Sequence, residues 1–429
     1  MNPCFSRFCR AAAVLLAVTV ARPVAGDSDR YRIVWQADPA SQVTLVWHQV
    51  KGDSPIVFYG TEDRGTRVEN YPNSVTPTGR VDYMGMETRS VTLKYLQPDT
   101  AYYFVIRDSH GVGPRHWFRT APDRPQPFTF VGGGDTKSDL FRRPVGRRGN
   151  RLVAKLRPLF VVFAGDFTSG KGLNERSWQN WLSDWYQDTT SQDGRLCPIV
   201  PVRGNHESDA DLLFHLFGLT SRDNYFAFNV GGNLLRVYAL NTQIPPTGEQ
   251  RKWLLEDLKT NREVPFKLAA YHKPMRPHTT YKPSNDYVYD AFAVPFFDYG
   301  MSIALEGDSH LHKITYPIRP STAAGSHDGF IRDDVRGTMY LGEGSWGAMT
   351  RPANNTKPWT MQTGRFPQIK WFHVYPNHID IRTLPTESAD QVGVNSEQDV
   401  LAIPENLRPF APEPHGPVVR FPYAATAPE

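Results

Sequence analysis

Five apolar segments of this 429-residue chain are each followed by residues that can bind a metal ion. These residues are carboxylates, an amide and imidazoles: Asp135, Asp166, Asn205, His272, Asp308 and His310. Oxygen and imidazole donors without a thiolate suit Fe, Mn or Zn at a reactive site better than a structural zinc. A single strand that ends in Gly-Asp is common as a turn. The same donor chemistry after five segments predicts one shared metal site.

Strands that alternate with helices are expected to position these residues. From residue 127 onward, strands are predicted at 128–131, 159–164, 197–202, 225–228, 234–240, 266–270, 303–305, 339–341, 371–374 and 379–384. Helices are predicted at 147–156, over the apolar face of Trp178, Trp181, Leu182 and Trp185, and at 249–258, where Thr247 and Gln250 resemble a capping box. The carboxyl ends of strands in an open α/β fold meet in one crevice. We therefore expect the five strand ends to converge.

The preceding part of the chain predicts an all-β sandwich. Residues 31–120 alternate apolar and polar side chains with a period of two, and no helical stripe interrupts them. The segment from Leu96 to Tyr102 resembles the corner of a fibronectin type III domain, in which a tyrosine hydroxyl bonds to the chain a few residues upstream. Trp47 is expected in the core. Three prolines within residues 121–127 predict a stiff linker.

Four regions follow from these patterns. They are a leader at 1–26, a fibronectin-like domain at 27–122, an α/β domain at 123–385 and a proline-rich, extended tail at 386–429. In the leader, Arg7 and Arg10 precede an apolar run that is short for a membrane span, and small residues precede Asp27. We interpret it as a secretory signal, with an uncleaved anchor as the alternative. The protein is then secreted or periplasmic, with no stable membrane span after cleavage.

Charge and cysteine usage narrow the possible partners. The net charge of +4 falls to about +1 without the three leader arginines, which argues against a polyanion-coating protein. A basic stretch at 142–157 is interpreted as a solvated helix face, with binding of nucleic acid or anionic lipid as the alternative. Cys197 is the only cysteine outside the leader, and its apolar surroundings predict a buried thiol.

Three sequence blocks resemble the calcineurin-like metallophosphoesterases: Gly165-Asp166, Gly204-Asn205-His206-Glu207 and Gly307-Asp308-Ser309-His310. The fibronectin-like front domain makes the purple acid phosphatases the nearest branch. The resemblance covers about residues 30 to 385. It implies a mixed fold, in which an all-β sandwich precedes a four-layer α/β metallophosphoesterase domain, a β-sandwich flanked by helices.

The same resemblance implies a dinuclear site and assigns its ligands. Asp166 would bridge two divalent or trivalent ions, which in such sites lie about 3.5–4 Å apart. The first ion would be held by Asp135 and His310, and the second by Asn205 and His272, with Asp308 beside them. His206 would stabilise or protonate the leaving oxygen. Arg203 and His278 are weaker candidates for binding phosphate oxygens.

Three positions depart from the family pattern. Ser169 stands where purple acid phosphatases have a tyrosine that binds iron and gives the colour, so this protein should not be purple. Lys137 stands where the broader family has a histidine, so the first ion lacks one expected ligand in either scheme. Asp139 could add an oxygen, although a surface carboxylate is the simpler reading.

The third departure is Asp308, which replaces a histidine when Gly307 to His310 is aligned to the family's Gly-His-x-His block. The other register makes His310 and His312 the ligand pair. We prefer the first register, because the second moves both imidazoles away from the glycine.

These observations predict an exported, metal-dependent phosphoesterase that acts on small phosphate monoesters, with diesters as a further substrate class. The alternative is a decayed phosphoesterase scaffold that serves as a cell-surface binding protein, and the departures at Lys137, Ser169 and Asp308 motivate it. The sequence does not specify the substrate, the metal pair or the oligomeric state.

Overall fold

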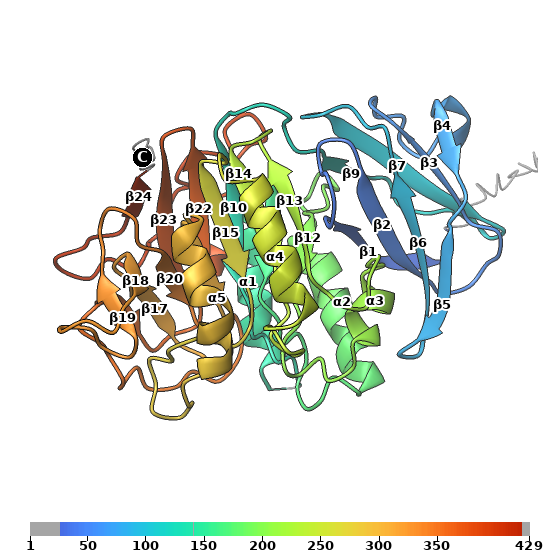
Figure 1. Cartoon of the computed structure of the whole chain (residues 1–429). Coiled ribbons are helices and arrows are strands. Elements are labelled where there is room, and N and C mark those ends of the chain that lie inside the picture. Colours follow the sequence, from blue (N-terminus) through green and yellow to red (C-terminus); the bar gives the residue numbers. More distant parts are fainter. Residues whose placement is uncertain (1–25, 140, 423–429) are drawn as a thin grey trace, which may run out of the picture.

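The computed structural model describes residues 26–139 and 141–422. The predicted leader lies outside the described residues except for Gly26. A β-rich N-terminal part precedes an α/β part whose sheets are flanked by helices, so the predicted fold class is confirmed (Figure 1). Within the described ranges, no helix has the length and apolarity needed to cross a bilayer.

Two packed sheets form the N-terminal part. One sheet contains β1 (Ser28–Val34), β2 (Val43–Gln49), β6 (Met86–Leu93) and β5 (Gly79–Tyr83). The other consists of β4 (Asn73–Val75), β3 (Ile56–Gly60), β7 (Ala101–Asp108) and β8 (Gly111–Val112), with β9 (His116–Arg119) paired to β7 and a short 3-10 turn at Val68–Asn70. Trp47 is fully buried between them, and the Tyr102 hydroxyl accepts a hydrogen bond from the Gln97 amide at 2.8 Å, as predicted.

The α/β part is also a sandwich of two layers, and its first layer belongs to the same ten-stranded sheet as β1, β2, β6 and β5. The first contains β24 (Val419–Pro422), β23 (His378–Pro385), β22 (Gln368–Tyr375), β10 (Phe128–Gly133), β11 (Phe160–Phe163) and β12 (Ile199–Pro201) in that order. The second contains β13 (Phe226–Val230), β14 (Leu235–Ala239), β15 (Phe266–Ala270), β16 (Ile303–Glu306), β20 (Met339–Gly342), β17 (His312–Thr315) and β21 (Thr360–Gly364). A separate hairpin joins β18 (Ile318–Pro320) to β19 (Phe330–Arg332).

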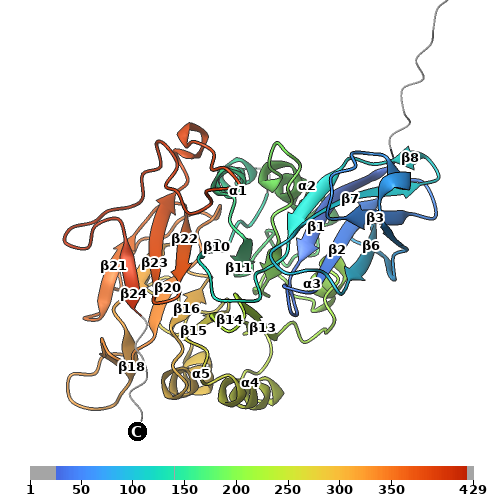
Figure 2. The same ribbon diagram turned by 90° about the horizontal axis from the view of Figure 1, so that it is seen from above.

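Helices cover both outer faces of this sandwich (Figure 2). On the first sheet lie α1 (Arg143–Leu156), α2 (Glu175–Thr189) and α3 (Asp211–Leu216), which share one apolar cluster with that sheet. On the second sheet lie α4 (Glu249–Thr260) and α5 (Asp286–Asp298). The tryptophans of α2 are buried in the core, as their helical spacing predicted.

The boundary between the two parts differs from the stiff linker that we expected. β1 pairs in parallel with β12, so one ten-stranded sheet runs from β24 through to β5. The apolar cluster between the sheets is likewise continuous across both parts. Residues 121–127 pack against their surroundings, since the Ala121 amide bonds to the Pro39 carbonyl and the Pro122 carbonyl accepts from the Gly231 amide. The two parts are therefore joined by strand pairing and a common apolar core, and not by this segment alone.

Three local expectations were wrong. The Thr247–Gln250 capping box does not form, because Gly248 precedes α4 without a side-chain cap and Gln250 hydrogen-bonds both backbone groups of Asn241. The C-terminal segment is not an extended tail over its described part, since it contains a 3-10 turn at Ala389–Gln391 and adds β24 to the sheet edge.

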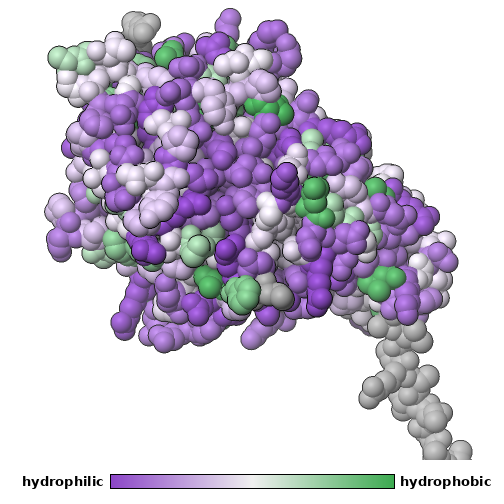
Figure 3. Space-filling model, turned by 90° about the horizontal axis from the view of Figure 1, so that it is seen from below, coloured by the Kyte–Doolittle hydropathy of each residue, from purple (hydrophilic) through white to green (hydrophobic). Residues whose placement is uncertain are grey.

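The basic face of α1 is the third correction, because three of its arginines are ion-paired within the protein as well as partly exposed to solvent. The pairs are Arg143 with Asp184, Arg147 with Asp188 and Arg151 with Asp390. Figure 3 shows the lower face of the molecule as mostly hydrophilic, with small separate hydrophobic patches.

Candidate metal centre

The ends of two sets of parallel strands bring the predicted ligands together. Asp135, Asp166 and Asn205 follow β10, β11 and β12, which are parallel neighbours in the first sheet. His272 follows β15, and Asp308 and His310 follow β16, its parallel neighbour in the second sheet. Two groups of donors result, Asp135–Asp166–His310 and Asp166–His272–Asp308, and within each group one donor atom per residue lies within 4.8 Å of the others. Asp166 belongs to both groups.

Five residues at this junction have left-handed backbone conformations that only glycine adopts without cost. Their φ angles are 61° at Asp135, 43° at Lys137, 58° at Asp166, 67° at Asp308 and 59° at His310. Each such residue costs on the order of 1 kcal/mol or more, and such strain persists where the surrounding structure enforces it, typically at functional sites. The strain therefore coincides with the donor cluster.

Glycines permit the close approach of the strand ends. A Cβ at Gly165, where φ is +86°, would lie 2.6 Å from the Gly204 Cα. A Cβ at Gly344, where φ is +58°, would overlap the Asp135 carboxylate. The glycines beside the ligands thus keep room for the donor groups.

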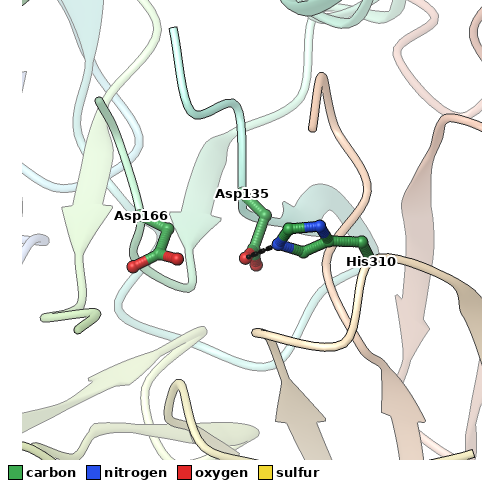
Figure 4. A group of neighbouring side chains, drawn as sticks. All are labelled: Asp135, Asp166 and His310. Atoms are coloured by element: carbon green, nitrogen blue, oxygen red, sulfur yellow. Dashed lines mark ion pairs between the residues drawn. The ribbon is translucent and has the colours of Figure 1, made fainter. Parts of the chain in front are cut away.

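The first donor group contains buried polar atoms without hydrogen bonds. In the described residues, Asp135 Oδ1, Asp166 Oδ2 and His310 Nε2 are buried and have no hydrogen-bond partner. Figure 4 shows the Asp135 carboxylate directed at the His310 ring, at 3.3 Å from Oδ1 to Nε2. His310 Nδ1 lies 3.0 Å from the Met349 carbonyl, which orients Nε2 toward the cluster. Burial lowers the pKa of His310, so its Nε2 lone pair is available to a metal ion.

The second donor group is arranged around His272 Nε2. This nitrogen lies 3.2 Å from Asp166 Oδ1, 3.0 Å from Asn205 Oδ1 and 3.6 Å from Asp308 Oδ1. His272 Nδ1 lies 2.8 Å from the Ala164 carbonyl, so the second imidazole is oriented in the same way as the first. Three oxygen donors around one imidazole nitrogen fit a bound cation, and together the two groups fit two ions bridged by Asp166.

Three ammonium groups outside the predicted ligand set contact its carboxylates, and one guanidinium contacts the backbone beside them. Lys137 Nζ lies 3.1 Å from Asp166 Oδ2. Lys273 Nζ and Lys282 Nζ lie 3.1 Å and 2.6 Å from the two oxygens of Asp308, and Arg351 donates to the Asp308 carbonyl. Burial by itself would raise the pKa of Asp308. The neighbouring His272, Lys273 and Lys282 outweigh this effect, so the pKa of Asp308 lies below its ordinary value. Lys273 could have been suspected because it follows His272, whereas Lys282 lies in a loop without a signature.

Glu207, the last residue of the Gly-Asn-His-Glu block, holds the backbone at Asp166. Its carboxylate accepts from the backbone amides of Gly204, Asp166 and Phe167 at 2.8 to 3.0 Å. Burial, followed by repulsion from Asp166, raises the pKa of Glu207 to about 7. His206 is half-buried, with Nε2 3.8 Å from Asp166 Oδ2, and burial lowers its pKa. His206 is therefore close enough to act on a group bound at the cluster.

Two predicted phosphate ligands are engaged elsewhere. Arg203 donates from Nε to the Glu207 carbonyl and from Nη2 to the Ser208 carbonyl, so it stabilises the loop rather than offering a free guanidinium. His278 is fully buried, with Nε2 2.8 Å from Thr360 Oγ1 and its ring against Trp359. It is a core histidine, and the proline-rich sequence around it gave no sign of this burial.

The remaining alternatives separate clearly in space. His312 lies outside both donor groups, fully buried beside Lys370 with Nδ1 2.5 Å from Nζ. The geometry thus favours the register with Asp308 and His310. Ser169 donates to the Lys137 carbonyl and to Asp139 Oδ2, and Asp139 also pairs with Arg142. Asp139 is committed to this loop rather than to the cluster.

A buried charge network stabilises the second set of strand ends. Lys313 Nζ lies 2.5 Å from Glu306 Oε2 and 2.6 Å from Glu343 Oε1, and all three side chains are at most 1% exposed. Glu306 also accepts from the Tyr271 hydroxyl and the Met275 amide. The Glu343 carbonyl accepts from the His310 amide at 2.7 Å. The network thus connects the strand ends that carry His272, Asp308 and His310.

Known proteins share both parts of this architecture. A family model described as the purple acid phosphatase N-terminal domain matches residues 28–120, and one described as calcineurin-like phosphoesterase matches residues 135–312. Probable purple acid phosphatase 20 of Arabidopsis thaliana is 22% identical over 259 residues, which are 54% of this chain and 56% of that protein. The chain thus aligns with little more than half the length of this relative.

Two solved structures share the fold. A purple acid phosphatase from yellow lupin (Lupinus luteus) seeds superposes with a TM-score of 0.68 at 14% identity, covering 90% of this chain and 78% of that one. The structure of PhoD superposes with a TM-score of 0.62 at 11% identity, covering 87% and 89% of the two chains.

Proposed function

We propose, on the premise that this chain belongs to the purple acid phosphatase branch of the calcineurin-like metallophosphoesterases, a family of hydrolases, that it hydrolyses phosphate monoesters at a dinuclear metal centre. One observation carries the proposal. The two donor groups share Asp166, whose Oδ1 lies 3.2 Å from His272 Nε2 and whose buried Oδ2 lies 3.1 Å from the Lys137 ammonium. A carboxylate with one oxygen on each side is suited to bridge two cations.

The donor groups define what each residue would hold. Asp135, Asp166 and His310 would bind the first ion, and Asp166, Asn205, His272 and Asp308 the second. Two bound ions, of Fe, Mn or Zn, would supply a water of lowered pKa and neutralise phosphate charge. The protein's own contribution is orientation, because both imidazoles are fixed through Nδ1 and the bridging residue through Glu207.

His206 is proposed as the proton donor to the leaving oxygen. Its position beside Asp166 would place a titratable imidazole next to an ester bound at the cluster, and it has no role as a ligand in either donor group. General acid catalysis of this kind contributes on the order of 10²- to 10⁴-fold. His206→Gln should therefore lower kcat for substrates with poor leaving groups far more than for aryl phosphates.

A second candidate function is that of a binding protein on a phosphoesterase scaffold that has lost its metals. The contacts of Lys137 with Asp166 and of Lys273 and Lys282 with Asp308 favour it, because three ammonium groups compensate the charges of these carboxylates without any metal. Metal content separates the two candidates directly.

The test combines elemental analysis with a phosphatase assay. Wild-type protein kept in buffer with excess Zn²⁺ or Mn²⁺ should bind close to two metal ions and hydrolyse an aryl phosphate, and chelation should abolish the hydrolysis. Asp166→Asn should lose metal and activity together, whereas Asp390→Asn, which alters an exposed carboxylate paired with Arg151, should retain both. Wild-type protein that binds no metal would support the binding protein on a metal-free scaffold instead.

Export remains part of the proposal. The leader-like residues 1–26 support secretion or transfer to the periplasm, where a small phosphorylated molecule would be the substrate. N-terminal sequencing of the mature protein recovered from culture medium or periplasm should begin near Asp27; an intact leader on cell-associated protein would contradict export.

A further inference from the structure

The two oxygens of Asp166 have different surroundings. Oδ1 lies 3.2 Å from His272 Nε2 and accepts from the His206 amide at 2.8 Å. Oδ2 lies 3.1 Å from the Lys137 ammonium. Since His272 belongs to the second donor group, Oδ2 is the oxygen available to the first ion. The Lys137 ammonium lies beside this oxygen, where the ion would bind.

Lys137 is held firmly in this position. Its side chain is 8% exposed, its amide bonds to the Asp166 carbonyl at 3.0 Å and its carbonyl accepts from Ser169 Oγ at 2.8 Å. Its left-handed backbone, at φ 43°, is a conformation that lysine rarely adopts.

Metal binding at the second donor group is less restricted by neighbouring lysines. It has four donors where the first has three. The ammonium groups of its lysines, Lys273 and Lys282, pair with Asp308, and their side chains are 20% and 19% exposed. Both therefore have room to turn toward solvent when a cation binds, whereas Lys137 is enclosed.

We propose that Lys137 makes the two metal positions unequal, so that the second position fills first and the first binds its ion weakly and exchangeably. This inference rests on the proposed dinuclear site. The physical cause is competition, because an enclosed ammonium neutralises Asp166 Oδ2 and repels a cation placed beside it. Lys137 then serves as a built-in cation at the first position whenever that position is vacant.

The experiment measures metal binding rather than activity. Metal-free protein is titrated with Zn²⁺ or Mn²⁺ by calorimetry, and bound metal is counted after extensive dialysis. The wild type should show two steps whose dissociation constants differ by at least about 100-fold, and should retain about one ion after dialysis. Lys137→Met and Lys137→His should tighten the weaker step by about 10-fold or more, and Lys137→Arg should keep it weak.

Controls separate this effect from general charge loss. Lys171→Met, on the exposed loop after β11, should leave both steps unchanged. Two equal steps in the wild type, or tightening by Lys282→Met in place of Lys137→Met, would overturn the inference. If the wild type binds no metal, the dinuclear function fails, yet a gain of metal by Lys137→His would still support exclusion by Lys137, and no gain would refute it. Circular dichroism confirms that each variant is folded.

Discussion

At the scale of single residues, the candidate centre depends on side chains held in conformations that their backbone alone disfavours. Asp135 and Asp166 place their carboxylates from left-handed positions, and His310 does the same for its imidazole. Each is held by specific neighbours, such as Glu207 behind Asp166 and the glycine at 344 beside Asp135. Small changes next to these residues should therefore affect metal binding more than stability.

Gly344→Ala tests this view. The added Cβ would overlap the Asp135 carboxylate and displace it, so the protein should lose the first metal ion. The left-handed backbone should cost about 1 kcal/mol of unfolding free energy in addition. Gly300→Ala is the matched control, because its φ of +66° is similar but nothing lies within 4 Å of the new Cβ. Urea unfolding should show a similar stability loss in both variants. Metal content, measured at equilibrium with excess Zn²⁺, should fall in Gly344→Ala alone, and equal metal content in the two variants would exclude this effect of the added Cβ.

At the scale of elements, two runs of parallel strands from opposite sheets meet at their carboxyl ends. β10, β11 and β12 supply donors from one sheet, and β15 and β16 supply donors from the other. The buried Lys313 network braces the second run, with its carboxylates on β16 and just after β20. The position of Asp308 and His310 thus depends on an ion pair that does not itself touch the cluster.

Lys313→Met should destabilise the protein by about 3–5 kcal/mol, because it leaves two buried carboxylates without their cation. Metal affinity should fall as well, since Glu343 holds the His310 amide. Lys252→Met, which removes an exposed lysine paired with Glu249, should leave stability nearly unchanged. A loss of less than about 1 kcal/mol in Lys313→Met, measured by urea unfolding, would show that the network is not required.

Many of the helices and strands, and the donor residues that follow the strands, could be predicted from sequence. The period-two strands, the tryptophan face of α2 and the donor after each strand are local patterns, and the structure contains all of them. Asp166 stood out because a glycine and a buried strand precede it. The cationic contacts could not be predicted, because Lys282 and Arg351 reach Asp308 from loops without periodicity. Burial of His278 and the loop contacts of Arg203 likewise depend on distant partners.

At the scale of the whole molecule, the N-terminal sandwich and the α/β part share one ten-stranded sheet. Sequence alone suggested two bodies joined by a linker, because pairing between β1 and β12 leaves no local signal. Side chains also cross the junction. His116 on β9 is 4% exposed, and its ring nitrogens lie 3.0 Å from the Tyr186 hydroxyl on α2 and 3.2 Å from the Gly194 carbonyl.

Acid should weaken this junction. Burial lowers the pKa of His116 to about 4 from its ordinary value of 6.5. The imidazole is therefore neutral in the folded protein, while the unfolded chain takes up a proton as the pH falls below 6.5. Stability is then lost progressively from pH 6.5 down to pH 4, by about 2 kcal/mol between pH 7 and pH 5.

Thermal unfolding of the wild type and His116→Gln checks this expectation. The variant should be less stable at pH 7 but lose less stability between pH 7 and pH 5. His110→Gln, which changes a more exposed histidine of the same part, should keep the wild-type pH dependence. Parallel pH profiles for the wild type and His116→Gln would exclude His116 as the source of acid sensitivity.

The central claim is that Asp166 bridges two metal ions, and anomalous diffraction from crystals grown with excess Mn²⁺ or Zn²⁺ tests it most directly. If Asp166 bridges two ions, we expect two anomalous peaks about 3.5–4 Å apart, one on each side of its carboxylate. One peak should lie beside Asp135 and His310, and the other beside His272 and Asp308. Crystals without a peak at Asp166, with Lys137 still on its carboxylate, would contradict the dinuclear centre and the hydrolase built on it.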